Sequence, residues 1–214
     1  MTAVSFYVQI VKALDEIEAP YMIVGAFGGY PFGITRVTFD IDILVDLHDQ
    51  DFEALSQGFP LPRYYADPEM MRNSTQMGII FNIIDTKEGI KADLVPLKRE
   101  PDYQVAFNRR IRRNFVDPAG NPFTAWVAQP TDTIIGKLEA WNEGRSDKHP
   151  KDIYSMVVFD LSDLSIDYEA VTKEAARMGR KHWRCGINLW QKQSKKLRNP
   201  KNNLAPFPSP QGEC

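Results

Sequence analysis

Seven residues from Phe39 to Val45 constrain the fold more than any other segment of the chain. Asp40 and Asp42 alternate there with apolar residues, which predicts a strand over 39–46 with one face in the core. Successive strand side chains point to opposite faces, so the two carboxylates are expected side by side. Like charges held that close repel each other unless a cation lies between them. The pair therefore predicts a site for a hard divalent cation, and Mg²⁺ is the expected ion.

The composition is that of a globular protein. The 214 residues, 43% hydrophobic and 25% charged, are enough for one domain with an appendage or for two small domains. No apolar run approaches the roughly 20 residues that cross a bilayer, and the N-terminal residues do not form a secretory signal. Cys185 and Cys214 form no disulfide or ligand framework. A cytoplasmic protein with reduced thiols, not bound to a membrane, is expected.

The hydrophobic patterning changes character near residue 129. The expected strands cover 21–24, 39–46, 77–86, 90–97, 111–117 and 122–127, and those over 77–86 and 90–97 are expected to form a hairpin. The expected helices cover 4–18, 26–32, 50–56, 131–142 and 152–159, with one or two more within 168–197. Asp49 is the expected cap of the helix over 50–56. The stretch 57–75 contains three prolines and is expected to be irregular, with at most one helical turn. This order predicts an α/β core over 1–128, a helical region over 129–198 and a disordered tail over 199–214.

A glycine follows the strand over 21–24. A strand that turns through Gly25 into a helix leaves backbone N–H groups that favour an anion such as a phosphate. Gly28 and Gly29, which ten residues separate from Asp40, are the alternative pair, and Gly25 is preferred because it directly follows the apolar strand. A glycine after a strand also serves simply as a turn residue, so the spacing to Asp40 is what gives Gly25 its interest.

Together these residues resemble the nucleotidyltransferase superfamily, which has a polymerase-beta-like fold. In this chain thirteen residues separate Gly25-Ala26 from Asp40-Ile41-Asp42-Ile43. Residues 33–38, Gly-Ile-Thr-Arg-Val-Thr, resemble the branch that contains abortive-infection-type toxins and related bacterial nucleotidyltransferases. Ala26 departs from the Gly or Ser of the family, so a hydroxyl contact to a triphosphate would be missing. The resemblance implies a mixed-sheet core followed by a helical region.

The resemblance also implies the site residues. Asp93, the one acidic residue within 90–97, corresponds to the third carboxylate of the family, which would hold two Mg²⁺ ions together with Asp40 and Asp42. The residues that would contact the nucleotide or border its site are Gly25, Ala26, Arg36, Thr38, Lys137, Lys151 and Asp152. For the last three, a solvated helix followed by a capped turn is the alternative interpretation.

The implied reaction moves a nucleoside monophosphate from an NTP to an acceptor hydroxyl. The segment 173–201 carries ten Lys or Arg and one acidic residue, Glu174, which favours RNA or tRNA as the acceptor. A solvated helix face explains the same charges. A protein hydroxyl or a small molecule such as an aminoglycoside is the alternative acceptor, and a nucleotide-binding regulatory protein without turnover is the alternative function. The resemblance to the toxin-like branch implies that an antitoxin partner is possible, but the sequence does not identify one.

Overall fold

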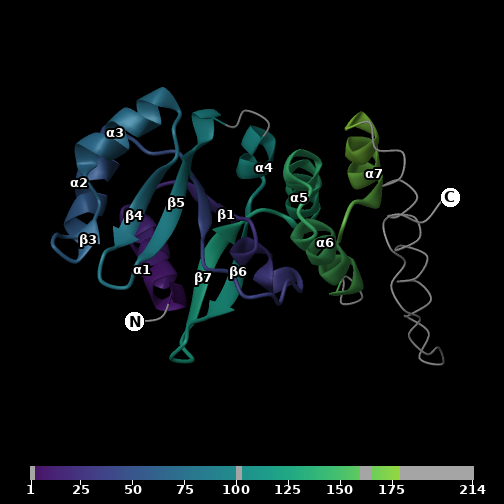
Figure 1. The fold of residues 1–214 in the computed structure, drawn as a ribbon, viewed down its shortest axis with the longest axis horizontal. Coiled ribbons are helices and arrows are strands. Elements are labelled where there is room, and N and C mark those ends of the chain that lie inside the picture. The colour runs from purple at the N-terminus through teal and green to yellow at the C-terminus, as the bar shows by residue number, and fades with distance from the viewer. Residues whose placement is uncertain (1–2, 100–102, 160–164, 179–214) are drawn as a thin grey trace. The chain divides into compact units, whose positions relative to one another are not determined.

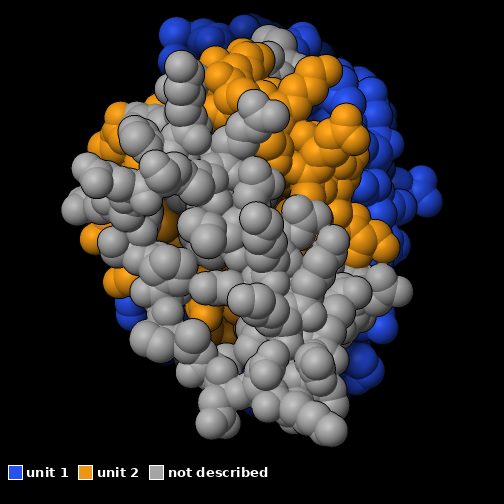
Figure 2. All heavy atoms as spheres, turned by 90° about the vertical axis from the view of Figure 1, so that its right-hand side faces the viewer, with its two compact units in different colours: residues 1–31, 36–129 blue, residues 32–35, 130–214 orange. Residues whose placement is uncertain are grey.

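The computed structural model of the chain describes residues 3–99, 103–159 and 165–178 (Figure 1). The chain divides into two compact units, residues 1–31 with 36–129 and residues 32–35 with 130–214, which Figure 2 colours separately. Most of the basic segment over 173–201 and the whole tail over 199–214 lie outside the described residues. None of the helices in the described part of the chain is long and apolar enough to cross a membrane.

A seven-stranded mixed sheet forms the first unit, in the order β3-β4-β5-β2-β1-β7-β6. The pairs β2–β5 and β1–β7 are parallel, and the other neighbours are antiparallel. The strands are β1 (Tyr21–Val24), β2 (Asp42–Val45), β3 (Tyr64–Tyr65), β4 (Phe81–Asp85), β5 (Ile90–Pro96), β6 (Ile111–Val116) and β7 (Pro122–Val127). The predicted mixed α/β fold class is confirmed.

The first unit also contains helices. They are α1 (Ala3–Glu16), α2 (Asp49–Gly58), α3 (Pro68–Met77) and α4 (Gln104–Asn108), with the 3₁₀ helices η1 (Phe27–Phe32) and η2 (Leu97–Arg99). The last residue of η1, Phe32, belongs to the second unit. The helix α1 packs against β5 and buries Phe6, Ile10 and Leu14 completely, as its helical spacing predicts. A second apolar cluster joins Met22 and Leu44 of the sheet to Phe107 of α4.

The strand expected over 39–46 begins only at Asp42, so the alternation argument does not apply to Asp40. The reason is the length of the partner strand. Asp42 pairs with Val24, the last residue of β1, and Gly25 then turns the chain at φ +67°. On the other side the Ile41 carbonyl still accepts a 3.0 Å bond from the Asp93 amide. Asp40 therefore lies in the loop that leads into the strand.

The stretch 57–75 was expected to hold at most one helical turn, which is too little, because the ten-residue helix α3 occupies Pro68–Met77. Its end signals are clear: the Asp67 side chain accepts from the Met70 amide, Pro68 fills the first turn, and Gly78 ends the helix in the left-handed region. The start of α2 also differs by one residue. His48, not Asp49, is the N-cap, and its amide donates to Asp51 at 2.7 Å.

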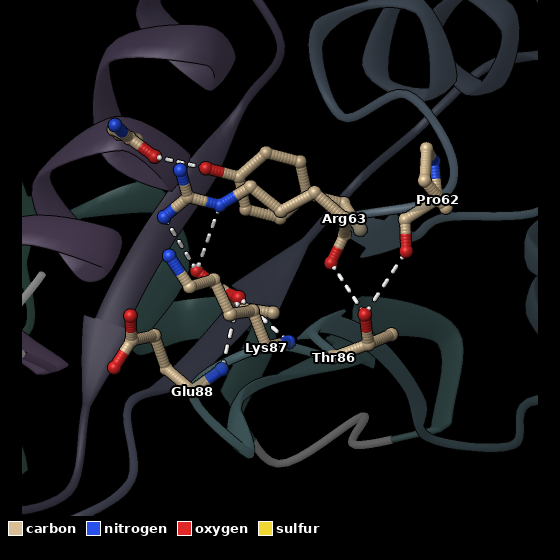
Figure 3. A network of polar contacts seen from close by, with 8 residues as sticks. Pro62, Arg63, Thr86, Lys87 and Glu88 are labelled. Carbon is tan, nitrogen blue, oxygen red and sulfur yellow. Dashed lines mark hydrogen bonds and ion pairs between the residues drawn. The ribbon is translucent and has the colours of Figure 1, made fainter.

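The predicted hairpin of β4 and β5 is confirmed, and a buried carboxylate anchors it (Figure 3). Asp85 is fully buried and accepts from the Arg63 guanidinium at 3.0 Å and from the amides of Lys87 and Glu88 at 3.1 and 3.2 Å. The Thr86 hydroxyl donates to the carbonyls of Pro62 and Arg63, at 3.0 and 2.8 Å. Burial opposes ionisation of Asp85, but the Arg63 hydrogen bond and the two amides outweigh it and hold its pKa below 3.8.

Three helices, α5 (Pro130–Gly144), α6 (Lys148–Phe159) and α7 (Tyr168–Arg177), make up the described part of the second unit with residues 32–35. Phe32 and Ile34 are buried. Gly33 adopts φ +92°, and a Cβ there would lie 2.4 Å from Cβ of Phe159. A short segment from the first half of the sequence is thus built into the helical unit.

Candidate active site

Two of the three predicted metal ligands lie side by side. Asp42 of β2 and Asp93 of β5 are direct partners in the parallel register. Along β5, Ala92 and Leu94 are fully buried, whereas the intervening Asp93 is partly exposed on the opposite face. The sheet therefore brings together two carboxylates that are 51 residues apart in sequence.

Asp40, in the loop, is held by a neighbouring hydroxyl. Thr38 is buried, and its Oγ1 donates a short hydrogen bond to Oδ1 of Asp40. The hydroxyl therefore restricts the orientation of the carboxylate although the segment is not part of the strand. Thr38 was expected to contact nucleotide, and that role stays a prediction.

Gly25 leaves the space that Asp42 needs. A Cβ at position 25 would lie 2.4 Å from Oδ2 of Asp42, too close for any side chain without movement of the carboxylate. Its φ of +67° also favours glycine. Gly28 has a different reason to be glycine, because its Cβ would lie 2.7 Å from the carbonyl oxygen of Ile23. Ala26, between them, is buried. The geometry connects Gly25 to the carboxylate pair and Gly28 to backbone packing.

Asp93 carries two partners that the sequence did not predict. The Asn82 side-chain amide, directly opposite on β4, donates to Oδ1 at 2.5 Å. The Lys91 ammonium, two residues before Asp93 on the same face, lies 2.7 Å from Oδ1 and 2.9 Å from Oδ2. The positive charge of the Lys91 ammonium therefore already neutralises Asp93, the third predicted metal ligand.

Tyr7 of α1 responds to the charge of all three carboxylates. Its side chain is fully buried, and its hydroxyl has no hydrogen-bond partner among the described residues. Burial, followed by the negative charges of Asp40, Tyr30, Asp93 and Asp42, raises the pKa of Tyr7 to about 12. Burial is the largest cause of the shift, and the three carboxylates add to it. No sequence signal distinguishes Tyr7 from an ordinary core residue of an amphipathic helix.

The donor set fits a hard cation in its chemistry. Asp40, Asp42 and Asp93 offer only carboxylate oxygens, the ligands that Mg²⁺ prefers. Across the described ranges, however, no three His, Cys, Asp or Glu side chains lie close enough together to hold a metal ion as they stand. The Lys91 ammonium acts as a stand-in for positive charge at Asp93. The residues therefore suit the metal, provided that the side chains rearrange.

The remaining predicted site residues fall in both units. Arg36 is half-buried in the first. In the second, the Lys137 ammonium lies 2.7 Å from Oδ2 of Asp152, and both side chains are buried, 5% and 3% exposed. Lys151 is exposed in the first turn of α6. The proposed contacts of these residues with nucleotide stay predictions.

Comparison with known proteins identifies the fold. No protein-family model and no curated protein sequence matches the chain. The crystal structure of an antigenic nucleotidyltransferase-like protein from Paracoccidioides brasiliensis is similar, with a TM-score of 0.50 and 13% identity over 88% of this chain and 92% of that chain. The antibiotic-resistance factor ANT(2'')-Ia aligns with a TM-score of 0.49 and 14% identity over 90% of this chain and 97% of that chain, a likeness too low to carry weight. The chain has a nucleotidyltransferase-like fold, and the toxin-like branch stays a prediction.

Proposed function

We propose that the chain is a Mg²⁺-dependent nucleotidyltransferase that moves a nucleoside monophosphate from an NTP to an acceptor hydroxyl. The observation that supports this most is the direct pairing of Asp42 with Asp93 across parallel strands of a nucleotidyltransferase-like sheet. In the reaction the acceptor oxygen bonds to the α-phosphorus as the bond to the β-phosphate breaks, and pyrophosphate leaves.

Asp40, Asp42 and Asp93 would hold two metal ions. When bound, Mg²⁺ supplies stabilisation of the triphosphate charge and acidifies the attacking hydroxyl. Asp93 would also help to take the proton of that hydroxyl. Gly25, which carries no side chain, lets the backbone approach the phosphates, and Arg36 would neutralise part of their charge. Lys137, Lys151 and Asp152 remain candidates for contact with nucleotide through the family resemblance alone.

The substitution Asp42→Asn tests the reaction. It keeps the shape of the side chain and removes its charge, so we expect Mg²⁺-dependent NTP binding to be lost and transfer to fall by about 100-fold or more. Asp46→Asn is the matched control, because Asp46 is exposed just after the same strand. Urea titration should show that both variants remain folded. Undiminished transfer by Asp42→Asn would contradict the proposed mechanism.

The acceptor in this proposal is an RNA or tRNA end, favoured by the basic composition of residues 173–201. Incubation with each radiolabelled NTP, Mg²⁺ and total RNA or lysate identifies the species that becomes labelled. RNA transfer should weaken steeply as the salt concentration rises, whereas turnover of a small molecule should not. Labelling of a protein, or of a small molecule such as an aminoglycoside, would replace RNA as the acceptor.

A regulatory protein without turnover is the second candidate, favoured by Ala26 in place of the family's Gly or Ser. Such a protein would bind NTP in an equilibrium assay and label nothing. A toxin that is paired with an antitoxin is a more specific proposal. It predicts that expression of the protein arrests growth and that Asp42→Asn abolishes this arrest.

A further inference from the structure

Lys91 neutralises Asp93 from within the same strand. Residues 91 and 93 share one face of β5, and the ammonium contacts both carboxylate oxygens, at 2.7 and 2.9 Å. Asn82 donates to Oδ1 from the neighbouring strand β4. Asp93 therefore accepts three hydrogen bonds, two of them from a cation.

A metal ion and the Lys91 ammonium cannot share this carboxylate without cost. Mg²⁺ binds carboxylate oxygens at about 2.1 Å, so an ion on Asp93 would lie within a few ångströms of the ammonium and repel it. Oδ1 already accepts from both Asn82 and Lys91, which uses the two lone pairs of that oxygen. Oδ2 accepts only from Lys91 and keeps one lone pair, but an ion bound there would lie beside the same ammonium, so metal binding is favoured when Lys91 moves away.

Lys91 is able to move. Its side chain is 51% exposed, whereas that of Asp93 is 18% exposed. A half-exposed ion pair contributes much less stabilising free energy than a buried bidentate pair. The ammonium is also hydrated again when it leaves the carboxylate, which lowers the cost of its movement. Asn82 keeps Asp93 oriented after the ammonium has gone, because its donation comes from a different strand.

We propose that Lys91 is a tethered cation that competes with Mg²⁺ for Asp93 and thereby sets the metal affinity of the site. Without metal it keeps the neighbouring Asp42 and Asp93 from repelling each other, and the incoming ion displaces it. This inference rests on the proposed function. The inference predicts that Lys91→Met raises the metal affinity of the site and lowers the stability of the metal-free protein.

The experiment measures binding of Mn²⁺ alone, followed by the electron paramagnetic resonance signal of the free ion, with no nucleotide present. Lys91→Met should bind about two- to fivefold more tightly than the wild type, the range that corresponds to a weak exposed ion pair. Its melting temperature without metal should fall by about 1 to 3 °C. Lys91→Arg, which keeps the cation, should resemble the wild type.

Lys87→Met is the matched control, because Lys87 is exposed in the turn of the same hairpin and its loss changes the net charge equally. It should leave Mn²⁺ affinity within about 1.5-fold of the wild type, since salt screens a distant surface charge. If Lys91→Met does not fold, Lys91→Gln replaces it, with circular dichroism as the check.

Three outcomes overturn the inference. Equal or weaker Mn²⁺ binding by Lys91→Met, with binding still lost in Asp42→Asn, refutes the competition and leaves the proposed function intact. An equal gain in Lys87→Met assigns the effect to net charge and also refutes it. Equal binding by the wild type and Asp42→Asn shows that no metal binds at these carboxylates, and then both proposals fail.

Discussion

Replacing Gly25 with alanine should damage the site more than the fold. The added Cβ would lie 2.4 Å from Oδ2 of Asp42 but 3.4 and 3.6 Å from the next atoms of that side chain, which is ordinary contact. The contact to be relieved is with the carboxylate tip alone. We therefore expect Gly25→Ala to displace one predicted metal ligand and to weaken Mn²⁺ binding at least tenfold.

The cost in stability follows from the same geometry. A residue with a Cβ at φ +67° loses about 1 to 2 kcal/mol relative to glycine. Forcing the Asp42 side chain off its preferred rotamer adds about 0.5 to 1.5 kcal/mol. Gly89 offers a matched control, because it has φ +66° and a Cβ there would meet nothing within 4 Å. Gly89→Ala should show the backbone cost alone.

Urea titration and Mn²⁺ binding, measured on both variants, separate the two effects. The variants should differ in free energy of unfolding by no more than about 1.5 kcal/mol, while only Gly25→Ala loses metal affinity. With Asp42→Ala as the background, Gly25→Ala should cost no more than Gly89→Ala, since the colliding oxygen is gone. Wild-type Mn²⁺ affinity in Gly25→Ala would refute the reasoning, as would an equal loss of affinity in Gly89→Ala.

Two buried carboxylates give further predictions. Lys137→Met or Asp152→Asn alone should lower the free energy of unfolding by about 3 to 5 kcal/mol in urea titrations, because each strands a buried charge, and the double variant should regain most of it. No coupling between the two substitutions would contradict this. Asp85→Asn should cost about 1.5 to 3 kcal/mol at pH 7. The folded pKa of Asp85 lies below 3.8, so its contribution is complete above that pH and is lost as the pH falls through the folded pKa. Wild type and Asp85→Asn should therefore converge in acid, and a gap that stays constant with pH would count against the assignment.

The sequence predicts the central feature of the site for a physical reason. The strand pattern around Asp42 and Asp93 fixes which face each residue occupies, and their pairing follows from the mixed sheet that the resemblance implies. Asp40 shows the limit of such reasoning. The apolar–polar alternation of the sequence includes Asp40. The strand β2 nevertheless begins only at Asp42, because Asp42 pairs with Val24, the last residue of β1.

The partners of Asp93 were beyond prediction because they depend on register. Asn82 lies opposite Asp93 only for one alignment of β4 on β5, and an exposed lysine in a strand looks like an ordinary surface residue. The helix α3 was predictable from Asp67-Pro68 at its start and Gly78 at its end, but the prolines before it favoured an irregular reading.

Residues 32–35 place a constraint on the order in which the protein folds during synthesis. They belong to the helical unit, and Gly33 packs on Phe159, which is synthesised 126 residues later. At translation rates of about 5 to 20 residues per second, the segment waits roughly 6 to 25 s for that partner. During this interval Phe32 and Ile34 are apolar side chains without their final surroundings. In a nascent chain these apolar side chains therefore stay without the helical unit to which they belong until that unit has been synthesised.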